Sequence, residues 1–561
     1  MTRYRGLLSR GRHASRVGDK EPTPRATRRF ARRRWWITFG LQFLVILGWS
    51  LATPLMASPD EPAHVIKAAA VARGEWLGIP LSGPHHEVTG FTYVRVPGIF
   101  NALMPSCYAF RPDVPASCMH ILPHPSKDVS VPTGAGRYPP LYYFVVGLPS
   151  LIWKSTRGIR LMRVVSGLLC AAFLASAFAS ASESRRRSFL VWGVAVAMTP
   201  MALFLAGTVN PSGLEIAAAI CLWTTGCELV LEKGTGVDHR LMARAGVSAA
   251  VLVQVRTISP LWMVMIIGTL VLVAGRQRLL ILARAPVAWI WAGVVILSST
   301  FALWWLHYAK ALASTGAKPP AVSLAHRIEQ ALGLTDAWLH EMVGVLGWLD
   351  TPAPFLTFYG VLFLVALFLS LGILTAEERR RPWILVALAA AVVVVPAYIQ
   401  VRGFAQVGGL FWQGRYALPL AAGVVILGAG LTTSERLPGR LIRRSRWLFA
   451  TVFLTAQGAI FVQDLRRYTV GFTSGNPFSG PWHPPFGSVP ITVFFAAALV
   501  GWTAWLIAIS GPTFAGTGDD HGSTLAGQAS TELVHSHGTI TDPVRVDVPD
   551  SSVVRTSEPI A

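Results

Sequence analysis

The sequence predicts an all-α polytopic membrane protein with about twelve transmembrane helices, and three observations support this prediction. Of the 561 residues, 52% are apolar and only 14% are charged, whereas soluble domains carry about 25% charged residues. The apolar residues fall into runs of about 20, the length with which an α-helix crosses the hydrocarbon core. The 20 Trp and 27 Phe are typical of a chain with many membrane interfaces, where aromatic side chains collect. An ordinary soluble enzyme is therefore disfavoured.

The two ends of the chain differ in charge. Residues 1–34 carry twelve Arg or Lys and precede the first apolar run, residues 35–57. The positive-inside rule makes this basic segment a cytoplasmic anchor, so the net charge of +21 indicates membrane orientation rather than a nucleic-acid partner. Residues 511–561 hold seven acids, two Arg and many Gly, Ser, Thr and Pro, which predicts a disordered cytoplasmic tail.

Twelve apolar runs form the predicted domain at 35–510. They are residues 35–57, 161–181, 189–206, 212–230, 243–256, 259–274, 286–306, 354–374, 383–400, 416–433, 447–463 and 488–510. A further run, 141–153, is too short to span, and Gly147 and Pro149 interrupt it, so we expect it to lie at the interface. If residues 141–153 do not span the membrane, five arginine-rich loops fall in the cytoplasm. If they formed a thirteenth span, all five loops would lie outside, against the positive-inside rule. Both termini are then cytoplasmic. These loops contain Arg185, Lys233, Arg276, Arg379 and Arg436.

Two predicted external segments are long. The first, residues 58–160, is expected to contain juxtamembrane helices. The second, residues 307–353, has apolar residues at the i, i+3, i+4 and i+7 positions from Leu339 to Leu346, which predicts an amphipathic helix on the outer membrane surface. It is either a connector or a gate for substrate. No ionisable residue lies near the middle of a predicted span, which disfavours an ion-coupled transporter.

The first external segment opens with Ser-Pro-Asp-Glu-Pro-Ala-His at residues 58–64. Asp60 suits a helix N-cap and Pro62 suits the first turn, so a purely capping role stays open. In the functional interpretation, Asp60 and Glu61 serve a transfer reaction, or Asp60 binds a metal ion, because a helix N-terminus favours a charged carboxylate. His64, one turn later, either orients Asp60 or is an ordinary surface histidine.

Several arginines are predicted to lie on the outer face, where guanidinium groups can bind phosphate in bidentate fashion. Two of them, Arg402 and Arg415, bracket a short loop rich in glycine and aromatic residues. The alternative for each is an interface residue that extends to the headgroups. In the same compartment, Cys107 and Cys118 are expected to form a disulfide. The candidate phosphate ligands are Arg137, Arg163, Arg256, Arg402 and Arg415.

A set of motifs occurs in a defined order along the chain: SPDEPAHV, RYPPLYYFVVGLP, RLMRVVSGLL, TPMALFLAGTVNPSGLE, GVLGWLDTPAP and WQGRYALPL. Over residues 35–510 the chain resembles an uncharacterised bacterial multi-pass membrane family, domain of unknown function 2142. That family in turn resembles the GT-C glycosyltransferases, such as the protein O-mannosyltransferases and the aminoarabinose transferase. Asp60-Glu61, Pro139-Pro140-Leu141 and Arg160-Leu161 or Arg163 match their acidic motif, juxtamembrane helix and second helix. Where many of those enzymes have a second acid, this chain has Asn210, and Glu215 lies a turn deeper.

The resemblance implies a plasma-membrane glycosyltransferase that moves a sugar from a polyprenyl-phosphate donor to a glycan, lipid or protein acceptor on the outer face. Asp60 is then the first choice as base and Glu61 the second, and a divalent cation such as Mg²⁺ or Mn²⁺ near Asp60 could assist the leaving phosphate. With one base we expect inversion at the anomeric carbon. The alternatives are a flippase or transporter for lipid-linked glycans, or a non-catalytic partner of an envelope assembly.

Overall fold

The computed structural model describes most of the central part of the chain. The tail that the sequence predicts to be disordered lies outside the described residues from residue 512 onward, and so do residues 1–23 of the basic segment. The described residues are 24–82, 88–121, 127–234, 236–312, 322–407, 409–433, 437–472 and 475–511.

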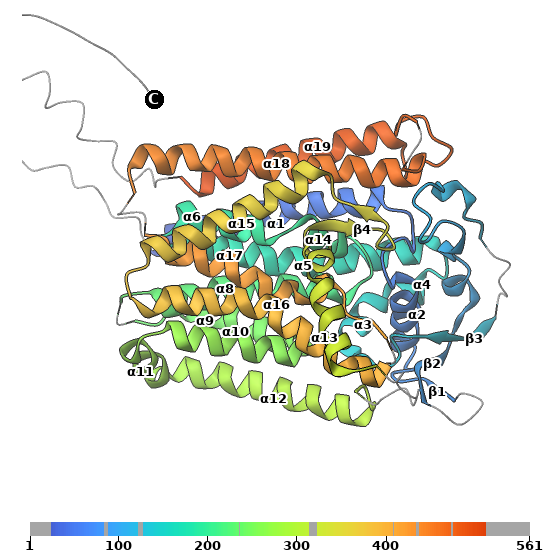
Figure 1. Ribbon diagram of the computed structural model, residues 1–561, viewed down its shortest axis with the longest axis horizontal. Helices are drawn as coiled ribbons and strands as arrows, with labels where there is room; N and C mark the ends of the chain where they lie inside the picture. Colours follow the sequence, from blue (N-terminus) through green and yellow to red (C-terminus); the bar gives the residue numbers. More distant parts are fainter. Residues whose placement is uncertain are drawn as a thin grey trace, which may run out of the picture. The chain divides into compact units, whose positions relative to one another are not determined.

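Long helices run side by side through the described chain (Figure 1). Nine of the described helices are long and apolar enough to cross a membrane, or up to eleven if two bent pairs each count as one span. The nine contain α1 (Pro24–Ala52), α5 (Thr156–Glu183), α8 (Pro211–Leu231), α12 (Pro286–Tyr308), α15 (Phe355–Thr375), α16 (Arg380–Val407), α17 (Leu418–Leu431), α18 (Gly439–Thr469) and α19 (Ser488–Ile509). The chain is therefore a multi-pass membrane protein, as predicted.

The two bent pairs explain why the number of spans differs from the predicted twelve. In one pair α6 (Arg187–Ala197) meets α7 (Pro200–Ala206) at 66°, and in the other α10 (Ser259–Val273) meets α11 (Arg276–Arg284) at 117°. The predicted span at 243–256 corresponds to α9 (His239–Leu252), which has only 14 residues, fewer than a membrane crossing needs. A count of twelve spans thus stays a prediction.

The bundle is packed most closely around α8 and α17, which are almost wholly buried. Gly423 allows their close approach, because a Cβ atom there would lie 2.3 Å from the indole of Trp223. The same indole donates a hydrogen bond to the carbonyl of Pro419 at 3.0 Å. Helices farther out expose large apolar side chains, including Trp289, Leu297 and Trp383, as expected for surfaces that face lipid.

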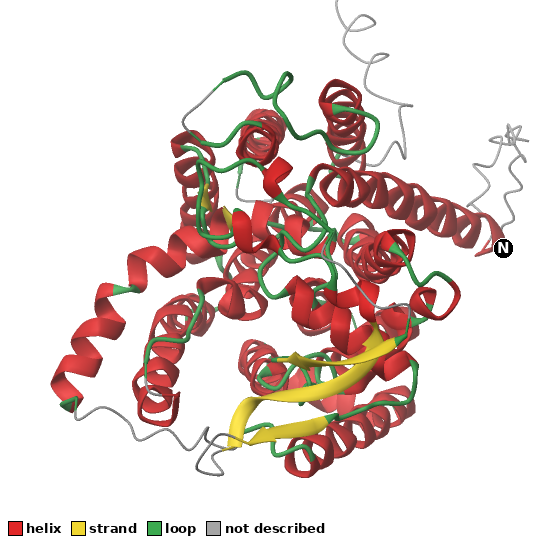
Figure 2. Cartoon of the chain, turned by 90° about the vertical axis from the view of Figure 1, so that its right-hand side faces the viewer, coloured by secondary structure: helices red, strands yellow, loops and turns green. Residues whose placement is uncertain are grey.

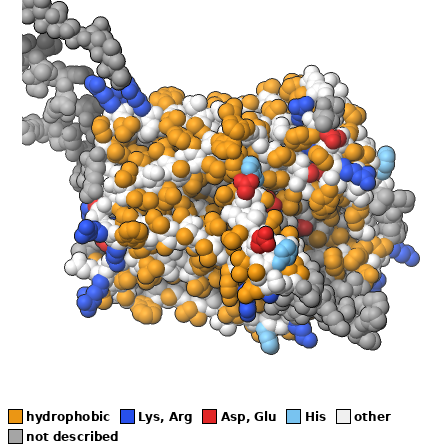
Figure 3. Space-filling model, viewed as in Figure 1, with side chains coloured by type: hydrophobic (Ala, Val, Ile, Leu, Met, Phe, Trp, Pro, Cys, Tyr) orange, Lys and Arg blue, Asp and Glu red, His pale blue; other side chains and the backbone are white. Residues whose placement is uncertain are grey.

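The basic connections between helices meet at one end of the bundle, the arginine-rich end. Lys233 pairs with Glu377 at 3.0 Å, Arg278 pairs with Glu232 at 3.0 Å, and Arg380 donates to the carbonyl of Ala274 at 3.0 Å. These contacts join the α8–α9, α10–α12 and α15–α16 connections. Apolar side chains cover the middle of the face in Figure 3, and Lys and Arg gather towards its edges. Arg436 of the fifth predicted loop lies outside the described residues.

The opposite end, the sheet end, is built from the long segment after α1. It holds an antiparallel sheet of β1 (Ile79–Ser82), β2 (Val88–Pro97) and β3 (Asp128–Thr133), in that order, and Figure 2 shows these strands lying across helices seen end-on. The expectation of an all-α chain was therefore incomplete.

Short helices accompany the sheet, as the prediction of juxtamembrane helices requires. They are α2 (Glu61–Ala72), α3 (Pro140–Gly147) and α4 (Pro149–Ile152). Because α3 and α4 have eight and four residues, the run at 141–153 is too short to span. The predicted disulfide joins Cys107 to Cys118, and it links the short helices η2 (Pro105–Cys107) and η3 (Ala116–Cys118).

The second long segment also crosses this part of the molecule. It forms α13 (Leu324–Gly333), α14 (Thr335–Gly344) and a two-stranded ribbon of β4 (Val345–Leu346) and β5 (Thr351–Pro352). In α14, Met342 and Val343 are buried, and a Cβ atom on Gly344 would lie 2.4 Å from Ile460 of α18. The predicted amphipathic helix exists, and its apolar face packs on protein.

Candidate active site

Asp60 precedes the first turn of α2, but its side chain does not cap the helix. Its backbone is left-handed, with φ 62° and ψ 3°, and its carboxylate makes no hydrogen bond to the helix N–H groups. Instead, Oδ2 accepts a hydrogen bond from Nη2 of Arg415 at 2.6 Å. A left-handed non-glycine residue is uncommon, although Asp tolerates it better than most. The capping interpretation is therefore wrong, and the backbone directs the carboxylate to an arginine.

Arg415 lies in the short helix η4 (Gly414–Ala417) and is 1% exposed. Its Nη2 group contacts Asp60, whereas its Nε and Nη1 groups have no hydrogen-bond partner within the described part of the chain. A buried charged donor without a partner is costly. The guanidinium of Arg415 is thus held ready for an acceptor from outside the described protein.

Helix α14 holds this arginine in place. The N–H of Gly414 donates to the carboxylate of Glu341 on α14, and a Cβ atom on Gly414 would lie 2.0 Å from the carbonyl oxygen of Trp338. Only glycine fits such a close approach of η4 to α14. The segment that sequence analysis left as a connector or a gate therefore positions a residue of the site.

Arg256 reaches the same place from the turn between α9 and α10. Its Cζ atom lies 4.3 Å from the ring centroid of Tyr416 and 5.9 Å from that of Tyr138. Its Nη1 group donates to Ser212 at 3.1 Å and lies 3.5 Å from Glu215 Oε2. Since Arg415 also lies 5.2 Å from the Tyr416 ring, two predicted phosphate ligands meet around one tyrosine.

The charges around Asp60 set its protonation state. Burial would raise the pKa of Asp60, but the positive charges of Arg415 and Arg256 lower this pKa below its usual value. The side chain of Asp60 is still half-exposed, at 50%. In the free protein Asp60 is therefore an ionised, accessible carboxylate.

His64 lies one turn into α2 and is buried, not a surface residue. Its Nδ1 atom is 2.9 Å from the hydroxyl of Tyr143 on α3. Burial lowers the pKa of His64 to about 3, so the ring is neutral at physiological pH. The ring lies near Asp60, and an orienting role for it stays a prediction.

Glu61 does not share the position of Asp60, and its contacts favour a structural role over the predicted catalytic one. Its carboxylate is fully buried and takes two hydrogen bonds from Arg163, Nε to Oε1 at 2.7 Å and Nη2 to Oε2 at 2.6 Å. The other N–H groups of Arg163 donate to the carbonyl oxygens of Ser50, Thr53 and Pro54. All five N–H donors of Arg163 are used, so none is left for the predicted phosphate. The pair ties α2 and α5 to the end of α1.

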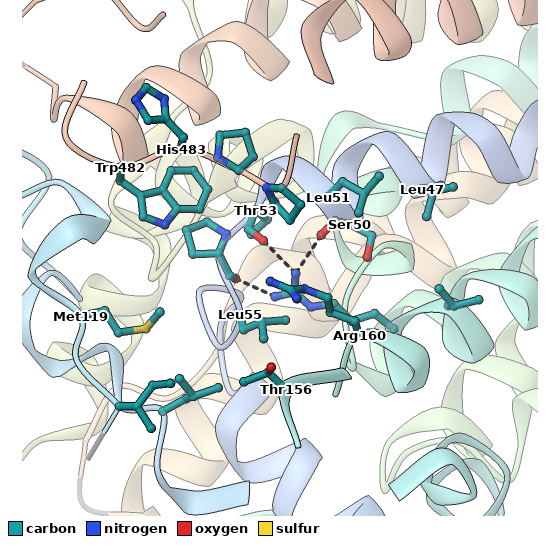
Figure 4. Close-up of a pocket in the computed structure, with 17 residues that line it drawn as sticks. Leu47, Ser50, Leu51, Thr53, Leu55, Met119, Thr156, Arg160, Trp482 and His483 are labelled. Atoms are coloured by element: carbon teal, nitrogen blue, oxygen red, sulfur yellow. Dashed lines mark hydrogen bonds between the residues drawn. The ribbon is translucent and has the colours of Figure 1, made fainter. Parts of the chain in front are cut away.

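A cavity of about 440 Å³ adjoins this pair, and Figure 4 shows its walls together with the hydrogen bonds to Ser50 and Thr53. It lies between the end of α1, the start of α5 and the segment before α19. It shares no lining residue with the cavity at Asp60. Its lining includes Leu47, Leu51, Thr156, Arg160, Trp482 and His483.

The two remaining arginines lie elsewhere. Arg137 is mostly buried and donates to the carbonyl of Lys310 at 3.3 Å, while its own carbonyl accepts from Trp305. Arg402 is exposed near the end of α16 and, within the described residues, forms neither an ion pair nor a hydrogen bond with Asp60 or Arg415. The predicted pair of Arg402 and Arg415 therefore does not converge, and Arg402 fits the alternative of an interface residue.

Asp60 also lines a cavity of about 320 Å³ at the sheet end, here called the Asp60 cavity. Its walls come from α2, the β2–β3 sheet and the turn between β4 and β5. Trp348 of that turn was not predicted to be functional, nor were Tyr138, Tyr416 and Glu341. Tyr138, Trp348 and Tyr416 all lie within the quoted motifs, which was the one available signal. The polar and aromatic lining residues are Asp60, Phe91, Asn101, Thr133 and Trp348.

The neighbours of Asp60 do not suit a divalent cation. Its carboxylate is paired with Arg415 and lies within the field of Arg256, and these positive charges would repel a metal ion. Among the described residues, no three His, Cys, Asp or Glu side chains are grouped as metal ligands. The expected Mg²⁺ or Mn²⁺ at Asp60 therefore finds no fitting ligand set here.

A buried lysine lies one turn beyond His64. Lys67 of α2 is 0% exposed, and its amino group donates to the carbonyl oxygens of Trp76 and Gly136, the latter at 2.5 Å. Burial lowers the pKa of Lys67 to about 7. Lys67 thus fixes the segment that leads into α3.

Comparison with known proteins gives one family and two related crystal structures. The family model described as "Predicted membrane protein (DUF2142)" matches residues 43–424, and no curated protein matches the sequence. Crystal structures of ArnT from Cupriavidus metallidurans are similar over much of their length. The undecaprenyl phosphate complex has 14% identity, a TM-score of 0.37 and coverage of 85% of this chain and 77% of that one. The apo state has 13% identity, a TM-score of 0.39 and coverage of 86% of this chain and 78% of that one. Because TM-scores below 0.5 do not establish a common fold, the proposed function rests on the side chains of the site.

Proposed function

The chain belongs to the DUF2142 family of predicted membrane proteins, and from its site we propose that it is a membrane glycosyltransferase. It moves a sugar from a polyprenyl-phosphate donor to a cell-envelope acceptor. The sheet end faces the outside of the plasma membrane and the arginine-rich end faces the cytoplasm, as the positive-inside rule requires. Both termini are then cytoplasmic.

One observation carries this proposal: Arg415 is buried, is paired with Asp60, and keeps Nε and Nη1 without partners in the described chain. Phosphate oxygens are strong acceptors for a guanidinium group and satisfy two of its donors at once. Arg256, which also lies near the Tyr416 ring, adds a second positive charge. A phosphate bound here would replace the missing acceptors.

The reaction is a displacement at the anomeric carbon. The oxygen of an acceptor hydroxyl forms a bond to this carbon, the bond from the carbon to the phosphate oxygen breaks, and polyprenyl phosphate leaves with the electron pair. Asp60 takes the hydroxyl proton. Arg415 and Arg256 stabilise the negative charge that develops on the leaving phosphate. A single displacement inverts the anomeric configuration.

Donor binding also prepares the base. In the free protein the charge of Arg415 holds the pKa of Asp60 down, which makes the carboxylate a weak base. When the phosphate draws the charge of Arg415 to itself, the pKa of Asp60 rises and proton transfer becomes more favourable. Asp60 therefore becomes an effective base only when the donor is in place.

Asn210, which stands where related enzymes have a second acid, has a supporting role. Its side-chain N–H donates to the carbonyl of Pro59 at 3.0 Å, and its side-chain oxygen accepts from the N–H of Ser212 at 3.0 Å. These bonds fix the residue before Asp60. The mechanism thus needs one carboxylate, in contrast to a two-acid scheme.

The proposal is tested by the binding of undecaprenyl phosphate to the purified protein in detergent, followed by native mass spectrometry. We expect Arg415→Ala to weaken binding about ten- to a hundredfold, since it removes charge-assisted hydrogen bonds worth about 1.5–3 kcal/mol. The matched control is Arg402→Ala, which should bind like wild type. Undecaprenol, which lacks the phosphate, should bind all three proteins equally. Equal phosphate binding by Arg415→Ala and wild type would refute the assignment.

A further inference from the structure

We propose that the Asp60 cavity binds one sugar ring of a carbohydrate acceptor, with the ring stacked on the indole of Trp348. This inference rests on the proposed function, and it names the acceptor class that the function leaves open. Trp348 then determines acceptor specificity without taking part in the chemistry.

The first argument is the composition of the cavity walls. Polar atoms are supplied by Asp60, Asn101 and Thr133, and broad apolar faces by Phe91 and Trp348. A pyranose ring has the complementary surface, with hydroxyl groups around its edge and C–H bonds on its faces. The negative face of an aromatic ring attracts such C–H bonds. Small-molecule sites generally combine apolar walls with a few placed polar groups.

The second argument is that Trp348 is held in a fixed orientation. Its Nε1 group donates to the carbonyl of Met56 at 3.3 Å, and Phe110 packs edge-on against it with the ring centroids 5.6 Å apart. One end of the indole is thus anchored, while the side chain remains partly exposed at the cavity. An anchored aromatic surface loses little freedom when a ligand stacks on it.

The third argument is the backbone that carries Trp348. Both neighbours are left-handed, Gly347 with φ 62° and Leu349 with φ 59°, and this conformation is unusual for leucine. The turn is clamped by the adjacent Asp350, which pairs with buried Arg467 at 2.8 Å. Such uncommon conformations persist where the surroundings enforce them, and they cluster at ligand-binding sites.

The fourth argument is the position of Asp60 between the two substrates. Its carboxylate contacts Arg415, and the same residue lines the cavity. A sugar hydroxyl in the cavity can therefore reach the base, while the donor phosphate binds at Arg415, which does not line the cavity. The volume of about 320 Å³ lies at the low end of the roughly 300–1,000 Å³ typical of ligand pockets. It is large enough for one sugar ring.

The experiment is saturation-transfer difference NMR on the whole protein in detergent, with a panel of methyl glycosides of hexoses, pentoses and N-acetylhexosamines as probes. We expect at least one glycoside to receive saturation at its ring C–H protons. Trp348→Ala should weaken that binding about tenfold, whereas Trp348→Phe should retain most of it. Phe91→Ala, in strand β2 of the cavity lining, tests the cavity without altering the turn and should also weaken binding. Phe486→Ala, an exposed aromatic residue outside the cavity, is the matched control.

Three results would overturn the inference: no glycoside binds wild type, binding is the same in Trp348→Ala and Phe91→Ala as in wild type, or undecaprenyl phosphate displaces the glycoside. The first result would favour a lipid or polypeptide acceptor, and the third would indicate that the donor, not the acceptor, occupies the cavity. Undecaprenyl phosphate binding is measured in the same samples. If only the acceptor inference is wrong, Arg415→Ala still weakens undecaprenyl phosphate binding. If the proposed function is wrong, Arg415→Ala binds undecaprenyl phosphate as wild type does.

Discussion

Adjacent carboxylates at the start of α2 should respond in opposite ways to the same chemical change. We expect Glu61→Gln to lower stability strongly, and we expect Asp60→Asn to abolish sugar transfer while leaving the protein folded. Glu61 is fully buried in its double hydrogen bond with Arg163, whereas Asp60 is half-exposed and turned toward a cavity. Comparing the two variants distinguishes a carboxylate that stabilises the fold from one that takes part in the reaction.

The magnitudes follow from burial. Breaking a buried ion pair on one side costs about 3–5 kcal/mol, because the remaining charge is left without compensation. For Asp60 the ion pair is partly screened by solvent, so we expect a loss of about 1 kcal/mol or less. Asn also tolerates the left-handed backbone and still offers Arg415 an acceptor oxygen. Loss of the base should reduce transfer by about 10²–10⁴-fold.

The assay has two readouts, the unfolding temperature in detergent and the restoration of the surface glycan in a strain that lacks the gene. Asp60→Gly is a useful third variant, since glycine adopts φ 62° without strain and removes the carboxylate entirely. It should be inactive, and it should be less stable than Asp60→Asn because it leaves the buried Arg415 without its ion-pair partner. A folded and active Asp60→Asn protein would refute the reasoning, and so would a Glu61→Gln protein as stable as wild type.

Three other predictions follow from the same structure. Between pH 7 and 10.5 the unfolded chain binds more protons at Lys67 than the folded protein does, so stability should rise with pH by up to about 1.4 kcal/mol per unit; Lys67→Met should remove that slope in thermal unfolding measured from pH 7 to 9. Replacing Cys107 and Cys118 by Ser should cost about 2–4 kcal/mol, seen as a lower unfolding temperature that reductant no longer changes. In intact cells, a cysteine introduced at Lys154 should react with an impermeant thiol reagent and one at Arg186 should not, and the reverse pattern would invert the proposed orientation.

The sequence was informative where one-dimensional patterns have a direct physical cause. Apolar runs predicted most of the membrane helices, and the placement of Arg and Lys correctly separated the arginine-rich end from the segment that includes the short helices α3 and α4. The disulfide was predictable because Cys107 and Cys118 lie close together in one predicted external segment. The spacing around Leu339 predicted α14.

The site itself was only partly predictable, because it depends on contacts between distant segments. The sequence does not reveal how the roles of Asp60 and Glu61 differ. Their ion-pair partners do: Arg163 gives Glu61 a structural role, and Arg415 places Asp60 in the proposed site. Arg402 looked as suitable as Arg415 because both flank one loop. The strands β1–β3 were missed because β2 buries Thr92 and exposes Phe91 and Tyr93, so its alternation does not separate apolar from polar positions. Trp348 could not be found because its turn depends on contacts with distant residues, such as Met56 and Arg467.

The two contacts that complete the site have a consequence for how the protein is made. Arg415 and Asp60 are 355 residues apart, and Arg467 and the carbonyl of Val114 are 353 residues apart. At about 5–20 residues per second of synthesis, roughly 20–70 s pass between the appearance of the first partner and the second. During that interval the residues of the sheet end have been synthesised, but Arg415 and Arg467 have not. If the proposed function is correct, a nascent or truncated chain in the membrane lacks the phosphate-binding arginine, and activity begins only after Arg415 and Arg467 have been added.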